Sequence, residues 1–196
     1  MLLEGVRIGY AITGSFCTFA KIIPQIEKLV SEGADVLPIV SESVNEYDTR
    51  FGKAEDFKNK LQTITGKIPI STIVEAEPIG PKALLDVLVI APCTGNTISK
   101  IANAITDGPV TMACKAHLRN MKPVVIAVST NDGLGANAKN IGALLNMKNI
   151  FMVPFGQDDP DKKCTSLVAD FDLILPSILE AIQNKQIQPI LIKNKI

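Results

Sequence analysis

The stretch LLDVLVIAPCTGNTISKIA, residues 84–102, decides the fold class, because an apolar run changes abruptly into a helical pattern. Its first part, 86–92, is rich in Val and Ile, which is typical of a buried strand. After the turn, apolar side chains recur at three- and four-residue steps and predict a helix over about 97–106. Open α/β sheets bind ligands where a strand ends in such a turn and enters a helix. The turn at 93–97 is therefore the first candidate for a binding site.

The same alternation of short apolar runs and helical patterns extends along the chain. The predicted strands are 6–12, 34–40, 86–92, 123–128 and 149–154, and the predicted helices are about 16–30, 54–65, 97–106, 109–119, 136–147 and 172–184. This order indicates repeated βαβ units and an α/β fold, in which helices cover both faces of a mostly parallel sheet. Pro38 cannot donate a backbone hydrogen bond, so we expect the second strand to lie at a sheet edge or to carry a bulge.

The length of 196 residues predicts a single domain over 1–196, whose last segment, 185–196, is a tail that either docks on the body or meets a partner. Lys plus Arg number 20 and balance 20 Asp plus Glu. This balance gives no support for nucleic-acid binding or for a basic membrane patch, so we expect a small-molecule ligand. The N-terminus lacks the features of a signal peptide, and no uncharged apolar run could span a bilayer, which favours a cytoplasmic protein.

Small polar residues follow four of the predicted strands. The first strand ends in TGSFCT, 13–18, which could be a helix cap alone or a loop whose glycine lets a phosphate or carboxylate approach the backbone. Ser41 and Ser43, after the second strand, could equally be ordinary turn residues. The turn at 94–97 carries three polar side chains where a cap needs one, and 129–135, STNDGLG, is a further polar exit. Convergence of these ends favours a ligand crevice over four independent caps.

Other kinds of site have weaker support. The single histidine, His117, shares a helical face with apolar residues, which favours a core or subunit-interface position and leaves no Ser-His-Asp arrangement. The four cysteines have no CxxC spacing and are expected to be free thiols, mainly structural. The segment QDDPDKK, 157–163, could hold a cation through its three Asp residues, but a solvated acidic turn is the favoured interpretation. We therefore expect no metal site.

The ITGS motif at 12–15, the hydroxyl-bearing loop after the second strand and APCTGNTISKIA at 91–102 together resemble the flavoprotein family that includes phosphopantothenoylcysteine decarboxylase and the lantibiotic cysteine decarboxylases. In that family the equivalent turn reads Pro-x-Ser/Thr-Ala-Asn-Thr, and the helix continues with Lys and Ala, as Lys100 and Ala102 do here. The resemblance covers about residues 5–130. It implies a Rossmann-like, three-layer α/β/α fold that binds flavin mononucleotide (FMN) at the subunit contacts of a homo-oligomer, a trimer or a higher assembly.

Carried over by position, the resemblance implies two groups of FMN contacts. Those around the phosphate and ribityl end are Gly14, Ser15, Phe16, Ser41 and Ser43, and those on the flavin side are Thr94, Asn96 and Thr97. Asn131 stands where the decarboxylases have the Asn of a Pro-x-Met-Asn segment. The candidate cofactor-binding residues are therefore Thr13, Gly14, Ser15, Phe16, Ser41, Ser43, Thr94, Asn96, Thr97 and Asn131. No residue is assigned a catalytic role.

Within the family, the whole chain, including NDGLGANAKNIG at 131–142, is similar to subunits that dehydrogenate dihydrodipicolinate to dipicolinate in the mother cell of sporulating bacteria, together with a partner subunit that binds NAD(P). The family's decarboxylases use a histidine after the second strand, and here no His precedes position 117, which argues against cysteine decarboxylation. The resemblance thus implies an oxidoreductase subunit that takes a small diacid and is active with its partner. Two other possibilities stay open: a stand-alone FMN-dependent decarboxylase or prenyltransferase, and a non-catalytic binding or scaffold subunit with a vestigial flavin site.

Overall fold

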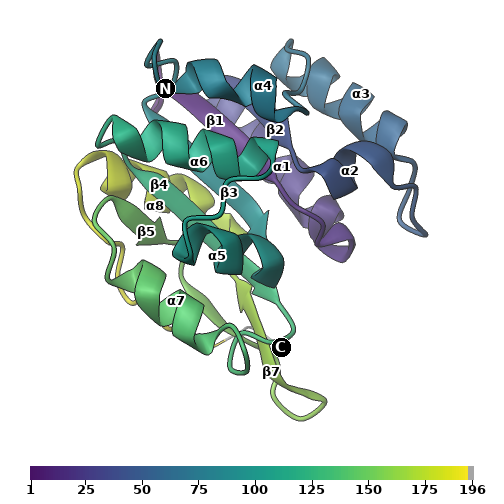
Figure 1. Cartoon of the computed structure of the whole chain (residues 1–196), viewed down its shortest axis with the longest axis vertical. Coiled ribbons are helices and arrows are strands. Elements are labelled where there is room, and N and C mark those ends of the chain that lie inside the picture. The colour runs from purple at the N-terminus through teal and green to yellow at the C-terminus, as the bar shows by residue number, and fades with distance from the viewer. Residues whose placement is uncertain (194–196) are drawn as a thin grey trace.

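The computed structural model describes residues 1–193 and shows a central seven-stranded sheet between two layers of helices (Figure 1). The strands are β1 Arg7–Ile12, β2 Asp35–Val40, β3 Val87–Cys93, β4 Val124–Thr130, β5 Ile150–Met152, β6 Phe155–Asp159 and β7 Lys163–Ala169. The α-helices are α1 Phe19–Ser31, α2 Glu42–Glu46, α3 Ala54–Thr65, α4 Ile73–Ala76, α5 Gly95–Ala102, α6 Pro109–Arg119, α7 Ala138–Leu145 and α8 Ile174–Ile182. Within the described part of the chain, none of the helices has the length and apolar character needed to cross a bilayer.

The sheet is parallel through its first five strands. Its order is β2-β1-β3-β4, with β5 beside β4, and each of these neighbours runs in the same direction. The chain goes from β1 to β2 on one side and then returns to place β3 on the other side of β1. The strand order therefore reverses between β1 and β3, and such a switch point leaves a crevice at the carboxyl ends of the two strands.

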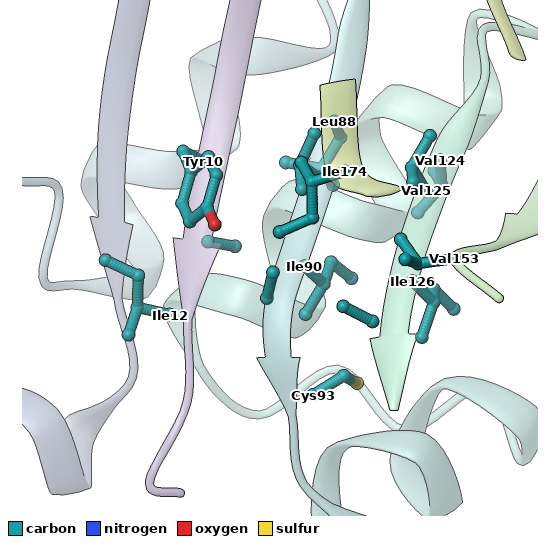
Figure 2. Close-up of a cluster of buried hydrophobic side chains, with 14 of the residues drawn as sticks. Tyr10, Ile12, Leu88, Ile90, Cys93, Val124, Val125, Ile126, Val153 and Ile174 are labelled. Atoms are coloured by element: carbon teal, nitrogen blue, oxygen red, sulfur yellow. The ribbon is translucent and has the colours of Figure 1, made fainter. Parts of the chain in front are cut away.

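Helices cover both faces of the sheet, as the sequence predicts. Helices α1 and α8 pack on one face, and α4, α5, α6 and α7 lie over the other (Figure 1). Every residue of β3 is buried, and the side chains of Tyr10, Ile12, Ile90 and Ile126 fill the space between the layers (Figure 2). The predicted three-layer α/β fold with a mostly parallel sheet is confirmed.

Strand β2 forms one edge of the sheet, which confirms the position expected from its proline. The carbonyl of Pro38 accepts a hydrogen bond of 2.9 Å from the amide of Ile70, and the amide of Val40 donates to the carbonyl of Ile70 at 2.8 Å. Because the outer neighbour is one residue rather than a strand, the missing amide of Pro38 interrupts no ladder.

The region after β5 differs from the prediction. The strand predicted over 149–154 is shorter, and residues 155–169 form an antiparallel hairpin, β6–β7, that the sequence pattern did not indicate. Strand β7 pairs antiparallel with the end of β4, where Thr130 faces Leu167. The acidic turn QDDPDKK lies within this hairpin, and its run of charged residues hides the alternation that marks a strand. The hairpin extends the sheet past the carboxyl end of β4, beside the crevice.

The predicted helices 54–65 and 109–119 match α3 and α6, whereas α5 begins and ends earlier than the predicted 97–106. The side chain of Thr94 accepts a hydrogen bond from the amide of Thr97 and caps the helix at Gly95. Ala104 then adopts a positive φ of 56°, which no helix accommodates, so the helix cannot continue. Because Thr94 is the cap, a single residue separates the end of β3 from the start of α5.

Residues of the predicted tail lie against the body. The amide of Met152 donates to Oε1 of Gln186 at 2.7 Å, and Nε2 of Gln186 donates to the carbonyl of Met152 at 2.7 Å. The amide of Phe155 donates to the carbonyl of Ile190 at 3.0 Å. The last three residues of the tail, 194–196, lie outside the described part of the chain.

Candidate functional site

The loop after β1 and the turn after β3 are joined at the switch point of the sheet. The hydroxyl of Thr13 donates to the carbonyl of Pro92 at 2.7 Å and accepts from the amide of Thr94 at 2.9 Å. Only 1% of Thr13 is exposed. The geometry therefore gives the Thr13 hydroxyl a role in holding the two loops together, while its neighbours face the crevice.

The loop after β1 also meets the end of β4. The hydroxyl groups of Ser15 and Ser129 are 2.8 Å apart, and the hydroxyl of Thr18 donates to the carbonyl of Ser15 at 2.8 Å. A Cβ on Gly14 would lie 2.8 Å from Oγ of Ser43, so the loops after β1 and β2 approach each other closely at this glycine. Polar strand ends that are far apart in the chain thus converge, as the sequence predicts.

The first turn of α5 rests on a partly buried polar network. The hydroxyl of Thr130 donates to Oδ1 of Asp132 at 2.5 Å, and the amide group of Asn137 donates to Oδ2 of Asp132 at 2.9 Å. A Cβ on Gly95 would lie 2.5 Å from Oγ1 of Thr130, so only glycine lets the helix start this close to the network. The amides at the start of α5 need partners from outside the helix, which makes this turn suited to an anion or a hydrogen-bond acceptor.

Two adjoining cavities open at these loops. The larger, of about 500 Å³, is lined by five of the predicted residues: Gly14, Ser15, Phe16, Thr94 and Asn131. The smaller, of about 220 Å³, is lined by seven: Thr13, Gly14, Ser41, Ser43, Thr94, Asn96 and Thr97. Gly14 and Thr94 belong to both cavities and form the boundary between them. The structure therefore brings all ten predicted residues together but groups Ser41 and Ser43 with the start of α5.

The two cavities differ in charge. The smaller contains Glu42, Lys100 and Asp107, and Lys100 pairs with Asp107 at 2.9 Å. The carboxylate of Glu42 packs so closely on Gly108 that a Cβ there would collide with it. Gly108 caps the start of α6, so the amide end of that helix favours the negative charge of Glu42. What remains in the smaller cavity is a hydroxyl-rich surface.

The larger cavity carries cations that the sequence analysis did not single out. Lys21, Arg50 and Lys163 line it together with one carboxylate, Asp158, which pairs with Lys163 at 2.7 Å. These residues come from α1, from the loop after α2 and from the unexpected hairpin, which have no common sequence signal. The fold alone brings them to one place. Phe51, beside Arg50, adds a second aromatic side chain to the one expected at Phe16.

His117 and two of the four cysteines lie in the core, as the sequence indicates, whereas Cys17 and Cys164 are exposed. His117 is 1% exposed, and its Nε2 is 3.0 Å from the carbonyl of Pro123, which confirms the core position. Burial lowers the pKa of His117 to about 4. The thiols of Cys93 and Cys114 are buried, and burial raises the pKa of both, that of Cys114 to about 12. Among the described residues, no three His, Cys, Asp or Glu side chains are arranged to hold a metal ion.

Comparison with known proteins gives relatives over nearly the full length. A family model described as Flavoprotein matches residues 2–183. The chain is 53% identical over 192 residues to the B subunit of dipicolinate synthase of Bacillus subtilis (strain 168), a match that covers 98% of this chain and 96% of that protein. The crystal structure of the B subunit of dipicolinate synthase from Bacillus halodurans C has a TM-score of 0.91, with 48% identity, and the match covers 99% of this chain and 100% of that one. The FMN-dependent cysteine decarboxylase SpaF shares the fold, with a TM-score of 0.61, 21% identity and coverage of 94% and 98%.

Proposed function

Because the chain belongs to the flavoprotein family, we propose that it serves as the B subunit of a dipicolinate synthase and dehydrogenates dihydrodipicolinate to dipicolinate with an NAD(P)-binding A subunit. The observation that carries this proposal is the 53% identity to the B subunit of dipicolinate synthase, which extends over 98% of this chain. Formation of the aromatic diacid removes a hydride and a proton. In this proposal the NAD(P)-binding partner subunit would supply the hydride acceptor, and the proton would pass to solvent.

FMN fits the pair of cavities as the cofactor. Its phosphate would lie in the smaller cavity, where the hydroxyls of Ser41 and Ser43 face the first turn of α5. The ribityl chain would cross at Gly14 and Thr94, and the ring system would extend into the larger cavity beside Phe16. This placement differs from the one carried over by resemblance, because Thr94, Asn96 and Thr97 share their cavity with the two serines. When bound, the flavin supplies reversible hydride transfer.

In this proposal the residues of the chain bind and orient the cofactor and the substrate. Thr94 and Asn96 present hydrogen-bonding groups at the start of α5, and the network behind Gly95 holds that turn in place. Ser15 and Ser129 line the larger cavity, and their hydroxyl oxygens are 2.8 Å apart. We further propose one domain over 1–196 with a C-terminal tail, assembly as a homo-oligomer, and location in the cytoplasm of the sporulating mother cell.

The stand-alone decarboxylase is disfavoured by the surroundings of the two cavities. Neither cavity is lined by a histidine, and His117 is buried in the core. With no imidazole within reach, the larger cavity lacks the general base that this side chain would provide at neutral pH. This arrangement favours dehydrogenation, in which aromatisation itself drives the reaction.

Co-purification of the chain with the NAD(P)-binding subunit tests the proposal. We expect the complex to form dipicolinate from dihydrodipicolinate, followed by the ultraviolet absorbance of the aromatic ring, and each subunit alone to be much slower. A partner subunit that reaches the full rate alone would show that this chain is a scaffold. Turnover of a cysteine-terminated peptide by the isolated chain would instead establish a decarboxylase.

A further inference from the structure

The larger cavity has an excess of positive charge. Three cations and one carboxylate line it, and the carboxylate, that of Asp158, forms an ion pair with Lys163 at 2.7 Å. Within residues 1–193, no carboxylate lies within ion-pair distance of Lys21 or Arg50. Two unpaired cations therefore face a cavity that also offers the hydroxyls of Ser15 and Ser129.

Arg50 is held by a short, well-bonded loop. The amide of Thr49 donates to the carbonyl of Gly52 at 3.0 Å, and the amide of Gly52 returns a bond of 3.1 Å. Oδ1 of Asp48 accepts from the amide of Ala54 at 2.9 Å and so fixes the loop to the start of α3. Arg50 and Phe51 occupy the tip of this loop. Because the loop is already ordered, less conformational entropy is lost when Arg50 binds a ligand.

The same loop brings an aromatic ring to the cavity. The guanidinium carbon of Arg50 lies 4.9 Å from the centre of the Phe51 ring, and 52% of Phe51 is exposed. Phe16, on the opposite loop, is supported by Phe19, whose ring centre is 5.3 Å away. The cavity of about 500 Å³ thus combines aromatic walls with cations, a combination that suits a planar anion.

We propose that Arg50 and Lys21 recognise the two carboxylates of a planar dicarboxylate in the larger cavity, and that this pair selects diacids over monoacids. This inference rests on the proposed function for the identity of the diacid. Arg50 binds one carboxylate through its planar guanidinium, and Lys21, at the start of α1, binds the other as a point charge. The charges match, since a diacid brings two negative charges to two unpaired positive ones.

Calorimetric titration of the complete complex with dipicolinate and, separately, with pyridine-2-carboxylate tests the inference. We expect the wild type to prefer the diacid by about tenfold or more, because a charge-assisted hydrogen bond contributes that much. Arg50→Ala and Lys21→Ala should each weaken the affinity for the diacid by about tenfold. The affinity for the monoacid should change by less than about threefold, because one cation remains to bind its single carboxylate. The affinity of Arg50→Lys for the diacid should fall between those of Arg50→Ala and the wild type.

Matched controls remove the same charge elsewhere. Lys28 is exposed in the last turn of the helix that carries Lys21, and Arg119 is exposed at the end of α6. Lys28→Ala and Arg119→Ala should keep the wild-type preference. Because Lys21 and Arg50 are exposed, circular dichroism should show both variants folded.

Equal affinity of the wild type for both acids, or an unchanged preference in Arg50→Ala and Lys21→Ala, would overturn the inference. If the wild-type complex forms dipicolinate but the variants keep the preference, the proposed function stands and the assignment of the two cations fails. If the complex forms no dipicolinate but the variants lose the preference for diacids, the proposed function fails and the dicarboxylate site stands.

Discussion

The hydroxyl oxygens of Ser15 and Ser129 lie 2.8 Å apart, although 114 residues separate them in the chain. Ser15 follows β1 and Ser129 lies near the end of β4, so their contact passes over the end of β3, which lies between these strands. Both residues line the larger cavity, and their contact places the loop after β1 beside the hairpin β6–β7. The loops around the crevice are therefore held together by contacts among their own polar residues.

Asn96→Ala is expected to weaken FMN binding. Asn96 is exposed in the first turn of α5 and lines the smaller cavity, so the substitution removes a ligand contact without disturbing the core. Loss of a hydrogen bond to a charged group should raise the Kd for FMN roughly tenfold. Quenching of flavin fluorescence during titration measures this change. Asn59→Ala, at an exposed position of α3, is the control, and equal Kd values for the two variants would contradict the placement of the phosphate.

Gly95→Ala should disrupt the turn that begins α5. The added methyl group would lie 2.5 Å from Oγ1 of Thr130 and 2.6 Å from Nδ2 of Asn137, so the network must open or the helix must shift. We expect a loss of about 1–3 kcal/mol in the free energy of unfolding, together with weaker FMN binding.

Gly142→Ala is the matched control for this substitution. Gly142 lies inside α7, and a Cβ there meets nothing within 4 Å. Replacing an unhindered helical glycine by alanine should stabilise the protein by about 0.5–1 kcal/mol. Urea denaturation measures both variants. A Gly95→Ala protein as stable as Gly142→Ala would show that the side chains of Thr130, Asp132 and Asn137 can move aside at no cost in stability.

Tyr10→Phe should stabilise the protein. The side chain of Tyr10 is completely buried, and within residues 1–193 its hydroxyl has no hydrogen-bond partner (Figure 2). Removing a buried, unsatisfied hydroxyl should increase the free energy of unfolding by about 1 kcal/mol. Tyr47→Phe is the control, because Tyr47 is 59% exposed and its hydroxyl is accessible to water. Destabilisation by Tyr10→Phe in denaturant unfolding would mean that the hydroxyl is hydrogen-bonded, for instance to a buried water molecule.

His117→Gln should remove part of the acid sensitivity of the fold. Burial lowers the pKa of His117 from 6.5 to about 4, so below pH 6.5 the unfolded chain binds a proton that the folded protein excludes. The contribution of neutral His117 to the free energy of unfolding is fully present above pH 6.5. It is lost as the pH falls towards 4, by about 3 kcal/mol in total. The glutamine side chain of the variant can still donate to the carbonyl of Pro123 but does not titrate in this range.

The measurement is the free energy of unfolding at several pH values between 6.5 and 4. The curve of His117→Gln should be flatter than that of the wild type over this interval. Asp86 does not obscure the comparison, because its hydrogen bonds with Arg7 lower its pKa and move its own titration to more acidic conditions. Parallel curves for the two proteins would show that His117 is protonated in the folded state.

The parallel core and the convergence of the polar strand ends could be predicted because each depends on local sequence. Strands β1 to β4 are short, mostly apolar runs, and the polar residues at their ends follow directly in the chain. Parallel strands direct these ends to one side, so the convergence of Ser15, Asn96 and Asn131 required no knowledge of long-range contacts.

The hairpin β6–β7 and the loop that carries Arg50 could not be predicted because no local pattern marks them. Strand β6 is half polar, and three Asp residues at its turn resemble a solvated loop. Arg50 and Lys163 belong to distant segments and line one cavity only because the hairpin β6–β7 pairs with β4 in the folded chain. The division into two cavities likewise depends on side-chain positions at Gly14 and Thr94, which the spacing of residues does not contain.

An absorption spectrum of the purified protein, taken after incubation with FMN and removal of free dye, tests the central claim most directly. We expect a retained flavin band for the wild type and a much smaller one for Asn96→Ala. A wild-type protein that retains no flavin would show that the crevice between β1 and β3 is not a cofactor site, and the proposed flavin chemistry would be wrong for this chain.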